Sequence, residues 1–455
     1  MRQINVHDVA LDARFNRFHF LILFLCTVVI VADGYDMLIV GIALPMIVND
    51  MGVTPTQAGI MASASVFGMM LGALLIGSVA DSVGRRRAMM TCLAVFSAGT
   101  AAAGLTHDAV SFSVIRFIAG LGIGGVMPCV ITQMTEFSPR STRATMVTAS
   151  FSGFAMGGIA AALTGKALVE TYGWRSVFFT AALALLLIPL ITRLMPESMA
   201  FLVKRGRLDE LRVLLRRINP SVSVGAVDAL VCASEIRAGE GIGGRSGQLF
   251  SEGRTQATCM FWVASFMCLF MIFALGTWLV KLMANAGYSL GSAMTFALVL
   301  NIGALIGSIC VGRLGDRFPI RWVLVGLYLL AAFGIIMLSN KFSQPLLYLF
   351  TAIVGAATYG GQVLTFAYAA QFYPFALRGI GVGWITAVSR VGAIIAPIFL
   401  GFLITLKLPL EQDFIAVAIP AFIAAVAVSQ IRLQRISKDS SVTCSTHDTS
   451  ERYAP

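Results

Sequence analysis

Four charged side chains lie inside otherwise apolar stretches of the sequence. The segment VIVADGYDMLIVG at residues 29–41 contains Asp33 and Asp36, and two arginines, Arg116 and Arg390, stand in similar surroundings. A charge at the centre of a bilayer costs about 2.5–3.5 kcal/mol on insertion scales, so such residues usually face a cavity and act there. Because carboxylates can carry protons and arginines can bind anions, these side chains are the first candidates for chemistry.

Asp33 and Asp36 are three residues apart, which places both carboxylates on one face of a helix. Crowding of two acids and their removal from water both favour a bound proton on one of them. Gly34 between them would loosen the helix at this point. All four histidines fall outside the cores of the apolar stretches. We therefore predict Asp33 and Asp36 as a proton-coupling pair and Glu136 as a further candidate; a sodium ion, which also takes oxygen ligands, is the alternative.

Arg390 and Arg116 are the candidate anion ligands. Arg390 lies about 12 residues, or roughly 18 Å, beyond the inner end of its apolar stretch, which is close to the midplane of a bilayer. Arg116 enters its stretch from the outer side by about 9 residues, or roughly 13 Å. Arginine binds a carboxylate through two parallel hydrogen bonds, so an anionic substrate is expected at Arg390. The alternative is an internal ion pair between Arg390 and an aspartate that holds two halves of the chain together.

The elements that must position these residues are membrane-spanning helices. With 58% hydrophobic residues, 12% charged residues and a mean hydropathy of +0.85, the 455-residue chain is not a soluble globular protein. Apolar runs of about 20 residues, each long enough to cross a bilayer, recur along the chain. We predict twelve spans, at 20–48, 56–80, 88–106, 109–135, 143–168, 175–195, 258–284, 291–312, 321–340, 345–371, 379–405 and 411–431.

The basic residues are distributed unevenly between the connections. The net charge is +11 and the chain has 33 lysines and arginines. Two of them lie within spans. Five lie at alternate connections, those that fall on one side of the membrane, namely Lys166, Arg175, Lys281, Lys341 and Lys407. The remaining 26 lie at the termini and the opposite connections. This is the positive-inside pattern, which predicts a multi-pass membrane protein with both termini in the cytoplasm and gives no reason to expect nucleic acid as a partner.

The sequence shows no signature of an enzyme or of a bound cofactor. The eight cysteines form no CxxC or Cys/His cluster, so neither disulfides nor a metal site are expected. The sequence contains no HExxH, GxSxG or Walker motif, which argues against an enzyme and against ATP-driven pumping. GLGIGG at 120–125 fits the dinucleotide pattern GxGxxG, but it lies inside a predicted span, where close helix packing explains it better.

The composition divides the chain into four parts. We expect an N-terminal six-helix bundle at 1–195, a cytoplasmic linker at 196–257, a C-terminal six-helix bundle at 258–431 and a disordered cytoplasmic tail at 432–455. The linker contains KRGRLDELRVLLRRINP, whose leucines recur at helical spacing opposite a row of arginines. This basic amphipathic helix either lies at the inner membrane surface or is a solvated linker helix.

The two sets of six spans are related by a repeat. When the second half is shifted so that Gly303 falls on Gly68, further identical residues coincide in the same register: Gly72 and Gly307, Gly77 and Gly312, Asp81 and Asp316, Arg86 and Arg321, Gly120 and Gly355, Gly125 and Gly360, Pro139 and Pro374, and Arg143 and Arg378. Two parallel six-helix repeats with the substrate path between them is a transporter architecture.

Several of these segments resemble the motifs of one family. GSVADSVGRRR at 77–87 is similar to the loop signature of the major facilitator superfamily, and GRLGDRFPIR at 312–321 is similar to its second copy. RFIAGLGIGG at 116–125 and PESMAFLVKRGR at 196–207 resemble two further motifs of the superfamily. DGYD at 33–36, with Arg378 and Arg390, resembles the aromatic acid/proton symporter branch. The resemblance implies an all-α membrane protein of twelve transmembrane helices in two six-helix bundles.

The resemblance also implies a function. It predicts proton-coupled uptake of an aromatic carboxylate, such as benzoate or a hydroxybenzoate, across the bacterial inner membrane by alternating access, in the service of aromatic catabolism. The expected partners are the aromatic acid, protons and the lipid bilayer, with the monomer as the functional unit. The alternatives are a proton antiporter that exports drugs or metabolites, an importer of a non-aromatic acid such as muconate, and a membrane chemosensor. The fifth span reads SGFAMGGIAAA at 152–162, an incomplete antiporter signature, which favours import.

In this family the loop signature is thought to latch one conformation. The resemblance therefore implies gating roles for Gly77, Asp81, Arg85, Asp316 and Arg378. In physical terms, an acid beside arginines at a helix end can pair with a cation or accept bonds from a neighbouring helix N-terminus. The alternative is that these charges only anchor the topology.

Aromatic and polar residues at cavity depth complete the predicted substrate site. A benzene ring can stack on an aromatic side chain, which would suit the substrates of the family. With Arg390 and Arg116, the candidate contacts are Tyr35, Trp278, Tyr359, Gln362, Phe366 and Trp384. The alternative for each aromatic residue is that it packs inside a bundle or faces lipid.

Overall fold

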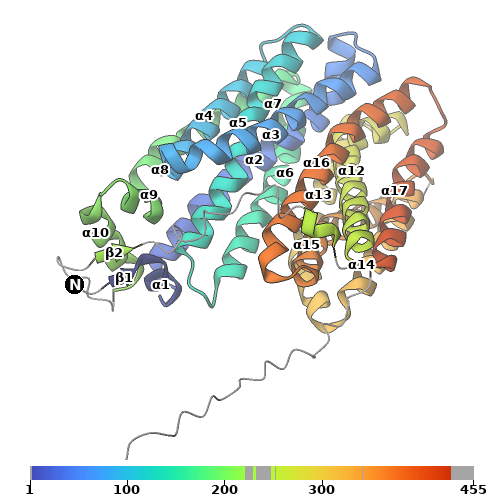
Figure 1. Cartoon of the computed structure of the whole chain (residues 1–455). Coiled ribbons are helices and arrows are strands. Elements are labelled where there is room, and N and C mark those ends of the chain that lie inside the picture. Colours follow the sequence, from blue (N-terminus) through green and yellow to red (C-terminus); the bar gives the residue numbers. More distant parts are fainter. Residues whose placement is uncertain (1–2, 221–228, 232–246, 252, 341, 432–455) are drawn as a thin grey trace, which may run out of the picture.

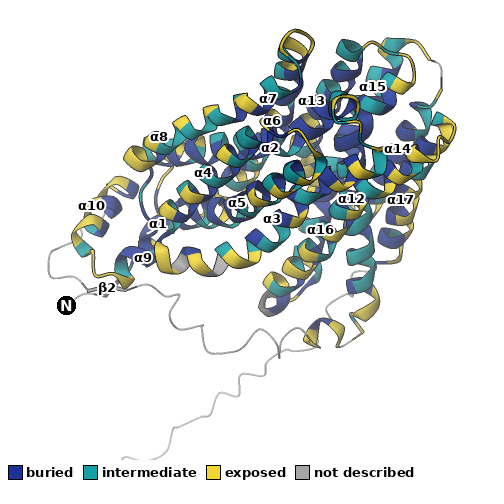
Figure 2. Ribbon diagram, turned by 90° about the horizontal axis from the view of Figure 1, so that it is seen from above, coloured by how far each residue is buried: buried dark blue, intermediate teal, exposed yellow. Residues whose placement is uncertain are grey.

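The computed structural model describes residues 3–220, 229–231, 247–251, 253–340 and 342–431, and the predicted tail at 432–455 lies outside this part. The described chain forms two helical bundles, with the blue-to-green half beside the yellow-to-red half in Figure 1. Buried residues lie along the helix faces that meet inside the bundles, while exposed residues line the outward faces and the helix ends (Figure 2).

The N-terminal bundle contains six spans. Five are single helices, and the sixth is continued through a short 3-10 segment: α2 (Arg17–Asp50), α3 (Pro55–Val83), α4 (Arg85–Ala103), α5 (Ala109–Phe137), α6 (Arg143–Tyr172), and α7 (Arg175–Thr180) with η1 (Ala181–Leu186) and α8 (Leu187–Leu194). Local sequence fixes the helix ends. Asn16 and Thr54 form capping boxes at the starts of α2 and α3. Gly84 separates α3 from α4 at a φ of 102°, a conformation that favours glycine.

The C-terminal bundle contains the other six spans, which are α12 (Thr255–Asn285), α13 (Leu290–Arg317), α14 (Ile320–Met337), α15 (Gln344–Phe372), α16 (Phe375–Thr405) and α17 (Leu410–Gln430). Within the described residues, 11 helices are long and apolar enough to cross a membrane. The twelfth predicted span corresponds to the 19-residue helix α4, whose first turn carries Arg85, Arg86 and Arg87 and is therefore less apolar.

Glycine packing repeats between the halves in the register of the sequence repeat. A Cβ atom on Gly68 of α3 would overlap the carbonyl oxygen of Phe117 on α5. A Cβ atom on Gly303 of α13 would likewise overlap the carbonyl oxygen of Ala352 on α15. Phe117 and Ala352 are themselves equivalent positions of the repeat. The same holds for Gly72 against Leu121 and Gly307 against Ala356, and for Gly120 against Ser65 and Gly355 against Leu300. Small residues thus let the second and fourth spans of each half approach closely.

A pair of arginines repeats in the same way. Arg86, near the start of α4, donates from Nη1 to the carbonyl oxygen of Met195, directly after the sixth span, at 3.3 Å. Its counterpart Arg321, near the start of α14, donates to the carbonyl oxygen of Ser429 at the end of α17. Both cations therefore satisfy carbonyl groups that the C-terminus of a helix leaves open.

The linker and the N-terminal segment pack on each other. They contain α1 (Val6–Leu11), α9 (Met199–Lys204), α10 (Leu208–Ile218), η3 (Gly247–Phe250) and a short parallel pairing of β1 (Gln3–Asn5) with β2 (Ala229–Val231), which the all-α expectation did not include. The apolar face of α10 is buried together with Val6 and Val9 in one core cluster; this face consists of Leu211, Leu214, Leu215 and Ile218. The apolar face of this helix is therefore covered by protein and not free to enter lipid, and its position at the membrane surface stays a prediction.

The two bundles contact each other through α2 with α12, α3 with α16, and α6 with α13. We call the side on which α2 and α12 begin the linker side and the other the far side. On the far side, Thr56 and Thr405 are joined by a hydroxyl hydrogen bond of 2.9 Å. The main chain of Gly41 also touches that of Gly276. These contacts bring the two bundles together on the far side of the interface.

Candidate functional site

Asp36 and Arg116 form a fully buried ion pair inside the N-terminal bundle. Nη1 of Arg116 lies 2.9 Å from Oδ1 of Asp36, and both side chains are essentially without solvent exposure. Nη1 also donates to the hydroxyl of Thr100 at 2.7 Å, and Nη2 donates to the hydroxyl of Ser65 and the carbonyl oxygen of Asp36, each at 3.2 Å. Thr100 in turn donates to Oδ1 of Asp36. The pair thus connects α2, α3, α4 and α5.

This network uses both terminal nitrogens of Arg116 within the bundle. The predicted role of Arg116 as a substrate ligand stays a prediction, since its guanidinium faces Asp36, Ser65 and Thr100 here. Removing one partner of a buried pair costs about 3–5 kcal/mol because it leaves an uncompensated charge. The arrangement therefore fits a fixed element that orients the first helix.

Asp33 lies one helical turn before Asp36 and has different surroundings. Its side chain is 1% exposed, and Oδ1 has no hydrogen-bond partner among the described residues. Arg390 of α16, in the other bundle, is near enough for its charge to act on Asp33, but the described residues show no hydrogen bond or ion pair between these two side chains. Arg390 is partly buried, and its Nη1 donates to the carbonyl oxygen of Met69 on α3 at 3.3 Å. Asp33 and Arg390 are therefore opposite charges on facing bundles that lie near each other without direct contact.

Tyr359 and Gln362 of α15 bring aromatic and polar groups to the same region. The ring of Tyr359 lies 6.4 Å from the ring of Phe154 on α6, between centroids, so this contact also crosses the interface. The amide nitrogen of Gln362 donates to the hydroxyl of Ser265 on α12 at 3.0 Å. The Tyr359 hydroxyl and the Gln362 amide oxygen are buried and have no hydrogen-bond partner within the described chain.

Two predicted aromatic contacts lie inside the bundles instead. Tyr35 is 9% exposed, and its hydroxyl donates to the carbonyl oxygen of Val177 at 2.9 Å and pairs with the hydroxyl of Thr164 at 3.1 Å. Trp278 is fully buried, and its indole nitrogen donates to the carbonyl oxygen of Pro397 at 2.9 Å. Both side chains hold neighbouring helices of one bundle together.

Phe366 and Trp384 are the remaining predicted contacts. Phe366 is partly buried and packs against the apolar cluster that both bundles share, one turn from Gln362. Trp384 of α16 is 43% exposed, and its ring lies 5.8 Å from that of Trp262 on α12. The ring contact of Trp384 lies within the C-terminal bundle, and a substrate contact for these two residues stays a prediction.

Glu136 lies on the linker side, away from Asp33. One carboxylate oxygen is 2.6 Å from Nη1 of Arg85, and the other accepts bonds of 3.0 Å from the Ser198 hydroxyl and the Ala200 amide. Along α5, Glu136 is about 20 residues, or roughly 30 Å of helix, beyond Arg116. It thus joins the predicted gating residue Arg85 to the start of α9, where a helix N-terminus favours a negative charge.

The other predicted gating residues lie at the same ends of the spans. Gly77 and Asp81 belong to α3, but the surroundings of both residues lie outside what the structure describes. Asp316 is exposed at the end of α13 and lines a cavity of about 530 Å³ with Arg321. Arg378 is exposed near the start of α16. Their gating roles stay predictions.

Sequence reasoning did not select several residues of this arrangement. Ser65 and Thr100 are small polar residues of a kind common in apolar helices, so only their contact with Arg116 distinguishes them. Phe154 is one of 31 phenylalanines, and nothing in its local sequence indicates that it faces Tyr359. Glu197, which accepts bonds from the backbone amides of Arg86 and Ser198, could have been found from the PESMAFLVKRGR motif.

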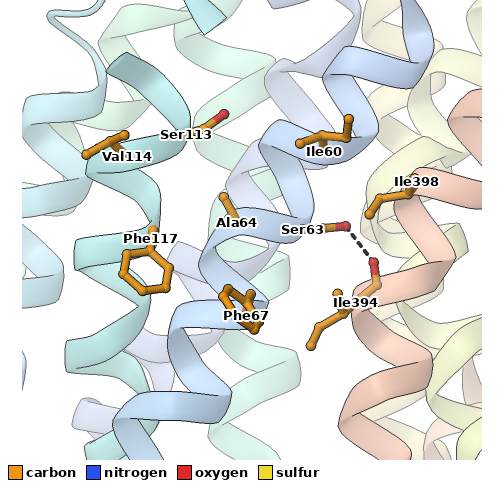
Figure 3. Close-up of a pocket in the computed structure, with 9 residues that line it drawn as sticks. All are labelled: Ile60, Ser63, Ala64, Phe67, Ser113, Val114, Phe117, Ile394 and Ile398. Carbon is orange, nitrogen blue, oxygen red and sulfur yellow. Dashed lines mark hydrogen bonds between the residues drawn. The ribbon is translucent and has the colours of Figure 1, made fainter. Parts of the chain in front are cut away.

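A separate cavity of about 380 Å³ lies between α3, α5 and α16 (Figure 3). Its lining contains no charged residue, and its two polar residues are Ser63 and Ser113. The hydroxyl of Ser63 donates to the carbonyl oxygen of Ile394 across the bundle interface at 2.7 Å. This cavity contains neither Asp33 nor Arg390 and is therefore distinct from the candidate site.

Comparison of the sequence with known proteins gives consistent matches. The model of the Major Facilitator Superfamily matches residues 24–308 and 261–441. A benzoate transport protein of Acinetobacter baylyi is 39% identical over 442 residues, covering 96% of this chain and 94% of the relative. A 4-hydroxybenzoate transporter of the same species is 31% identical, with 92% of each chain covered. A gentisate transporter of Corynebacterium glutamicum is 32% identical, covering 91% and 87%.

Solved structures share the fold. A bacterial homologue of the human lysosomal transporter Spinster, inward-facing and unoccupied, matches with a TM-score of 0.70 at 16% identity, covering 91% of this chain and 97% of the other. The Escherichia coli xylose transporter XylE in an inward open conformation matches with a TM-score of 0.68 at 15% identity, covering 92% and 98%.

Proposed function

Because the chain belongs to the major facilitator superfamily, among its aromatic acid transporters, we propose that it couples the uptake of an aromatic carboxylate to the uptake of a proton. Transport proceeds across the bacterial inner membrane by alternating access, with both termini in the cytoplasm. The observation that carries this proposal is that Asp33 is buried, makes no ion pair within the described structure, and lies within electrostatic range of Arg390 on the other bundle.

Coupling follows from a competition for one cation. Without substrate, Arg390 neutralises the ionised Asp33. When a substrate carboxylate binds the Arg390 guanidinium through two hydrogen bonds, Asp33 loses its counter-ion in a buried environment. A buried carboxylate without a counter-ion takes up a proton, so proton and substrate are bound together. Release of the substrate returns Arg390 to Asp33 and expels the proton.

Asp36 takes a different part in this cycle. Its pairing with Arg116 is independent of the other bundle, so it keeps α2 in register with α3, α4 and α5 while Asp33 changes its protonation state. Asp33 is thus the proton carrier of the DGYD segment, and Asp36 is the fixed acid.

The closed far side supports an inward-facing state. Contacts such as Thr56 with Thr405 seal the side that would face the periplasm. The Glu136–Arg85 pair lies on the linker side, where a latch would form and break as the bundles rock.

Purified protein in liposomes tests the proposal. With an inward proton gradient, the protein should accumulate labelled 3-hydroxybenzoate or benzoate, and a protonophore should abolish accumulation. Uptake that ignores the proton gradient would refute symport. Uptake driven by an outward proton gradient, or efflux driven by an inward one, would instead support a proton antiporter.

A further inference from the structure

The face of the C-terminal bundle near the candidate site carries neutral polar groups. Ser265 and Cys268 are three residues apart on α12, and Tyr359 and Gln362 are three residues apart on α15, so each pair shares one side of its helix. The Ser265 hydroxyl accepts from the Gln362 amide, which ties the two pairs together. This arrangement, which we call the neutral polar cluster, contains no charged residue.

Two members of this cluster have unused hydrogen-bonding capacity. The Tyr359 hydroxyl and the Gln362 amide oxygen are buried without a partner among the described residues. The Cys268 thiol donates to the carbonyl oxygen of Thr358 at 3.3 Å, so its hydrogen atom is already used in a hydrogen bond. Buried polar groups are nearly always paired, and each exception calls for a ligand, a water molecule or a function.

Two contacts connect the cluster to the helix that carries Asp33. The Tyr359 ring contacts Phe154 of α6, and the main chain of Phe154 packs directly on Gly34, the neighbour of Asp33. A benzene ring held near Phe154 and Tyr359, with its carboxylate on Arg390, would present its far edge to the C-terminal bundle. The neutral polar cluster is the set of groups that such an edge would meet.

We propose that Gln362 and Tyr359 bind a hydroxyl group on the substrate ring, so that the preferred substrates are hydroxylated aromatic carboxylates rather than benzoate itself. This inference rests on the proposed transport of aromatic carboxylates. A phenolic hydroxyl both donates and accepts, so it satisfies the free end of the Gln362 amide in either orientation, and the Tyr359 hydroxyl as well. Benzoate offers only C–H groups there and would leave both polar groups buried and unpaired.

The position of the hydroxyl on the ring matters. A hydroxyl at position 3 or 4 projects away from the carboxylate and can reach a second site. In 2-hydroxybenzoate the hydroxyl bonds to its own carboxylate, so it is not available to Gln362. This acid is therefore a control of the same composition that should behave like benzoate.

Competition for one labelled acid on purified protein in lipid nanodiscs tests the inference. The wild type should bind 3- or 4-hydroxybenzoate about tenfold more tightly than benzoate or 2-hydroxybenzoate, the factor expected for one well-placed hydrogen bond in a dry site. Gln362→Met should reduce that ratio to about one by weakening only the hydroxylated acid, and Tyr359→Phe should reduce it in part. Gln344→Met, the same change at the far end of α15, should leave the ratio as it is.

The outcomes separate this inference from the proposed function. Equal affinity of the wild type for benzoate and both distal hydroxybenzoates would overturn the hydroxyl site while leaving aromatic acid transport intact. Binding of none of these acids would overturn the proposed function itself. If Gln362→Met does not fold, an unchanged ratio in Tyr359→Phe overturns the inference, and a reduced ratio supports it.

Discussion

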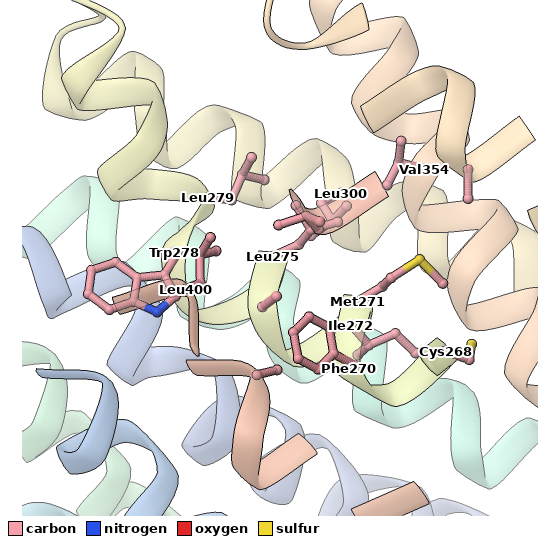
Figure 4. Packing of buried hydrophobic residues seen from close by; sticks show 14 of the residues in the cluster. Cys268, Phe270, Met271, Ile272, Leu275, Trp278, Leu279, Leu300, Val354 and Leu400 are labelled. Carbon is pink, nitrogen blue, oxygen red and sulfur yellow. The ribbon is translucent and has the colours of Figure 1, made fainter. Parts of the chain in front are cut away.

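The cores of the two bundles occupy equivalent positions but carry different side chains. The N-terminal set is Asp33, Asp36, Ser65, Thr100 and Arg116; the equivalent positions of the second half hold Cys268, Met271, Leu300, Ile335 and Thr351. Every residue in both sets is buried. Figure 4 shows Cys268, Met271 and Leu300 within the apolar packing of the C-terminal bundle. The ionic network of the first half is thus replaced by a largely apolar core in the second.

At two positions near the interface, the second half carries the more polar side chain. Arg390 corresponds to Ala155 in the first half, and Gln362 corresponds to Met127. The shared glycine contacts maintain the helix crossings of both halves, which leaves the remaining positions free to diverge. At the interface, Asp33 therefore belongs to the first half, and Arg390 and the neutral polar residues Tyr359 and Gln362 belong to the second. A cycle that moves both a proton and an anion must use both halves, because neither contains the complete site.

The largest effect is expected from Asp33→Asn. An amide cannot carry the proton, so accumulation of substrate against a gradient should fall to the level seen with a protonophore, whereas exchange of labelled for unlabelled substrate should persist. Vesicle uptake and counterflow measure the two quantities. Asp108→Asn, an exposed helix cap that asparagine also fills well, is the matched control. Normal accumulation by Asp33→Asn would remove Asp33 from the coupling step.

Arg390→Lys should weaken substrate binding by about tenfold or more, since lysine offers a point charge in place of a bidentate pair of hydrogen bonds. Equilibrium binding of the labelled acid measures this. The same change at the exposed Arg313 of α13 should have no effect. Unchanged affinity in Arg390→Lys would argue against contact between this side chain and the carboxylate.

Asp36→Asn compares the two cores directly. It leaves Arg116 buried without its counter-ion and should destabilise the protein by about 3–5 kcal/mol. At the equivalent position, Met271→Leu exchanges two apolar side chains of similar volume and should cost less than about 1.5 kcal/mol. Thermal unfolding in detergent measures both. Equal losses in the two variants would show that the ion pair adds nothing specific to the first half.

Glu136→Gln tests whether the linker-side cluster controls the rate. Loss of the charge-assisted bond to Arg85 should slow transport several-fold while substrate affinity stays the same. In the second half the equivalent residue is already a glutamine, Gln371, so Gln371→Asn should have little effect. Loss of substrate binding in Glu136→Gln would contradict a gating role and would favour the earlier expectation of coupling.

The smallest effect concerns the repeated arginine caps. Arg86→Ala and Arg321→Ala each remove a cation from the C-terminal end of the last span of their half. Each should lower stability by about 0.3–1 kcal/mol, the usual value of a charge at a helix terminus. Thermal unfolding of the two variants should give shifts of similar size, and a large loss in only one would show that the caps are not equivalent.

Much of the fold could be predicted because membrane spans and repeats leave strong patterns. The register of the repeat, set by glycines such as Gly68 and Gly303, holds in the helix crossings themselves. The linker helix was harder, because an amphipathic pattern gives the apolar face but not what covers it. At Leu211 and Leu215 the cover is the N-terminal segment and not lipid.

The sequence predicted which kinds of residue form the candidate site but not which of them contact each other. Charges such as Asp33 and Arg390 stand out in apolar surroundings, yet helix depth does not give the rotation of one helix against another. Tyr35 has the right depth but turns its hydroxyl toward Val177. The partner of Asp36 proved to be Arg116, which only the packing of α2 against α5 determines.

The most direct test of the exchange at Arg390 is the number of protons taken up when substrate binds. In weakly buffered solution with a pH indicator, purified wild-type protein should take up about one proton per bound aromatic acid, because Asp33 is protonated as Arg390 turns to the substrate. Asp33→Asn should bind without proton uptake, and Asp36→Asn, where folded, should retain it. Proton uptake that persists in Asp33→Asn would contradict the account.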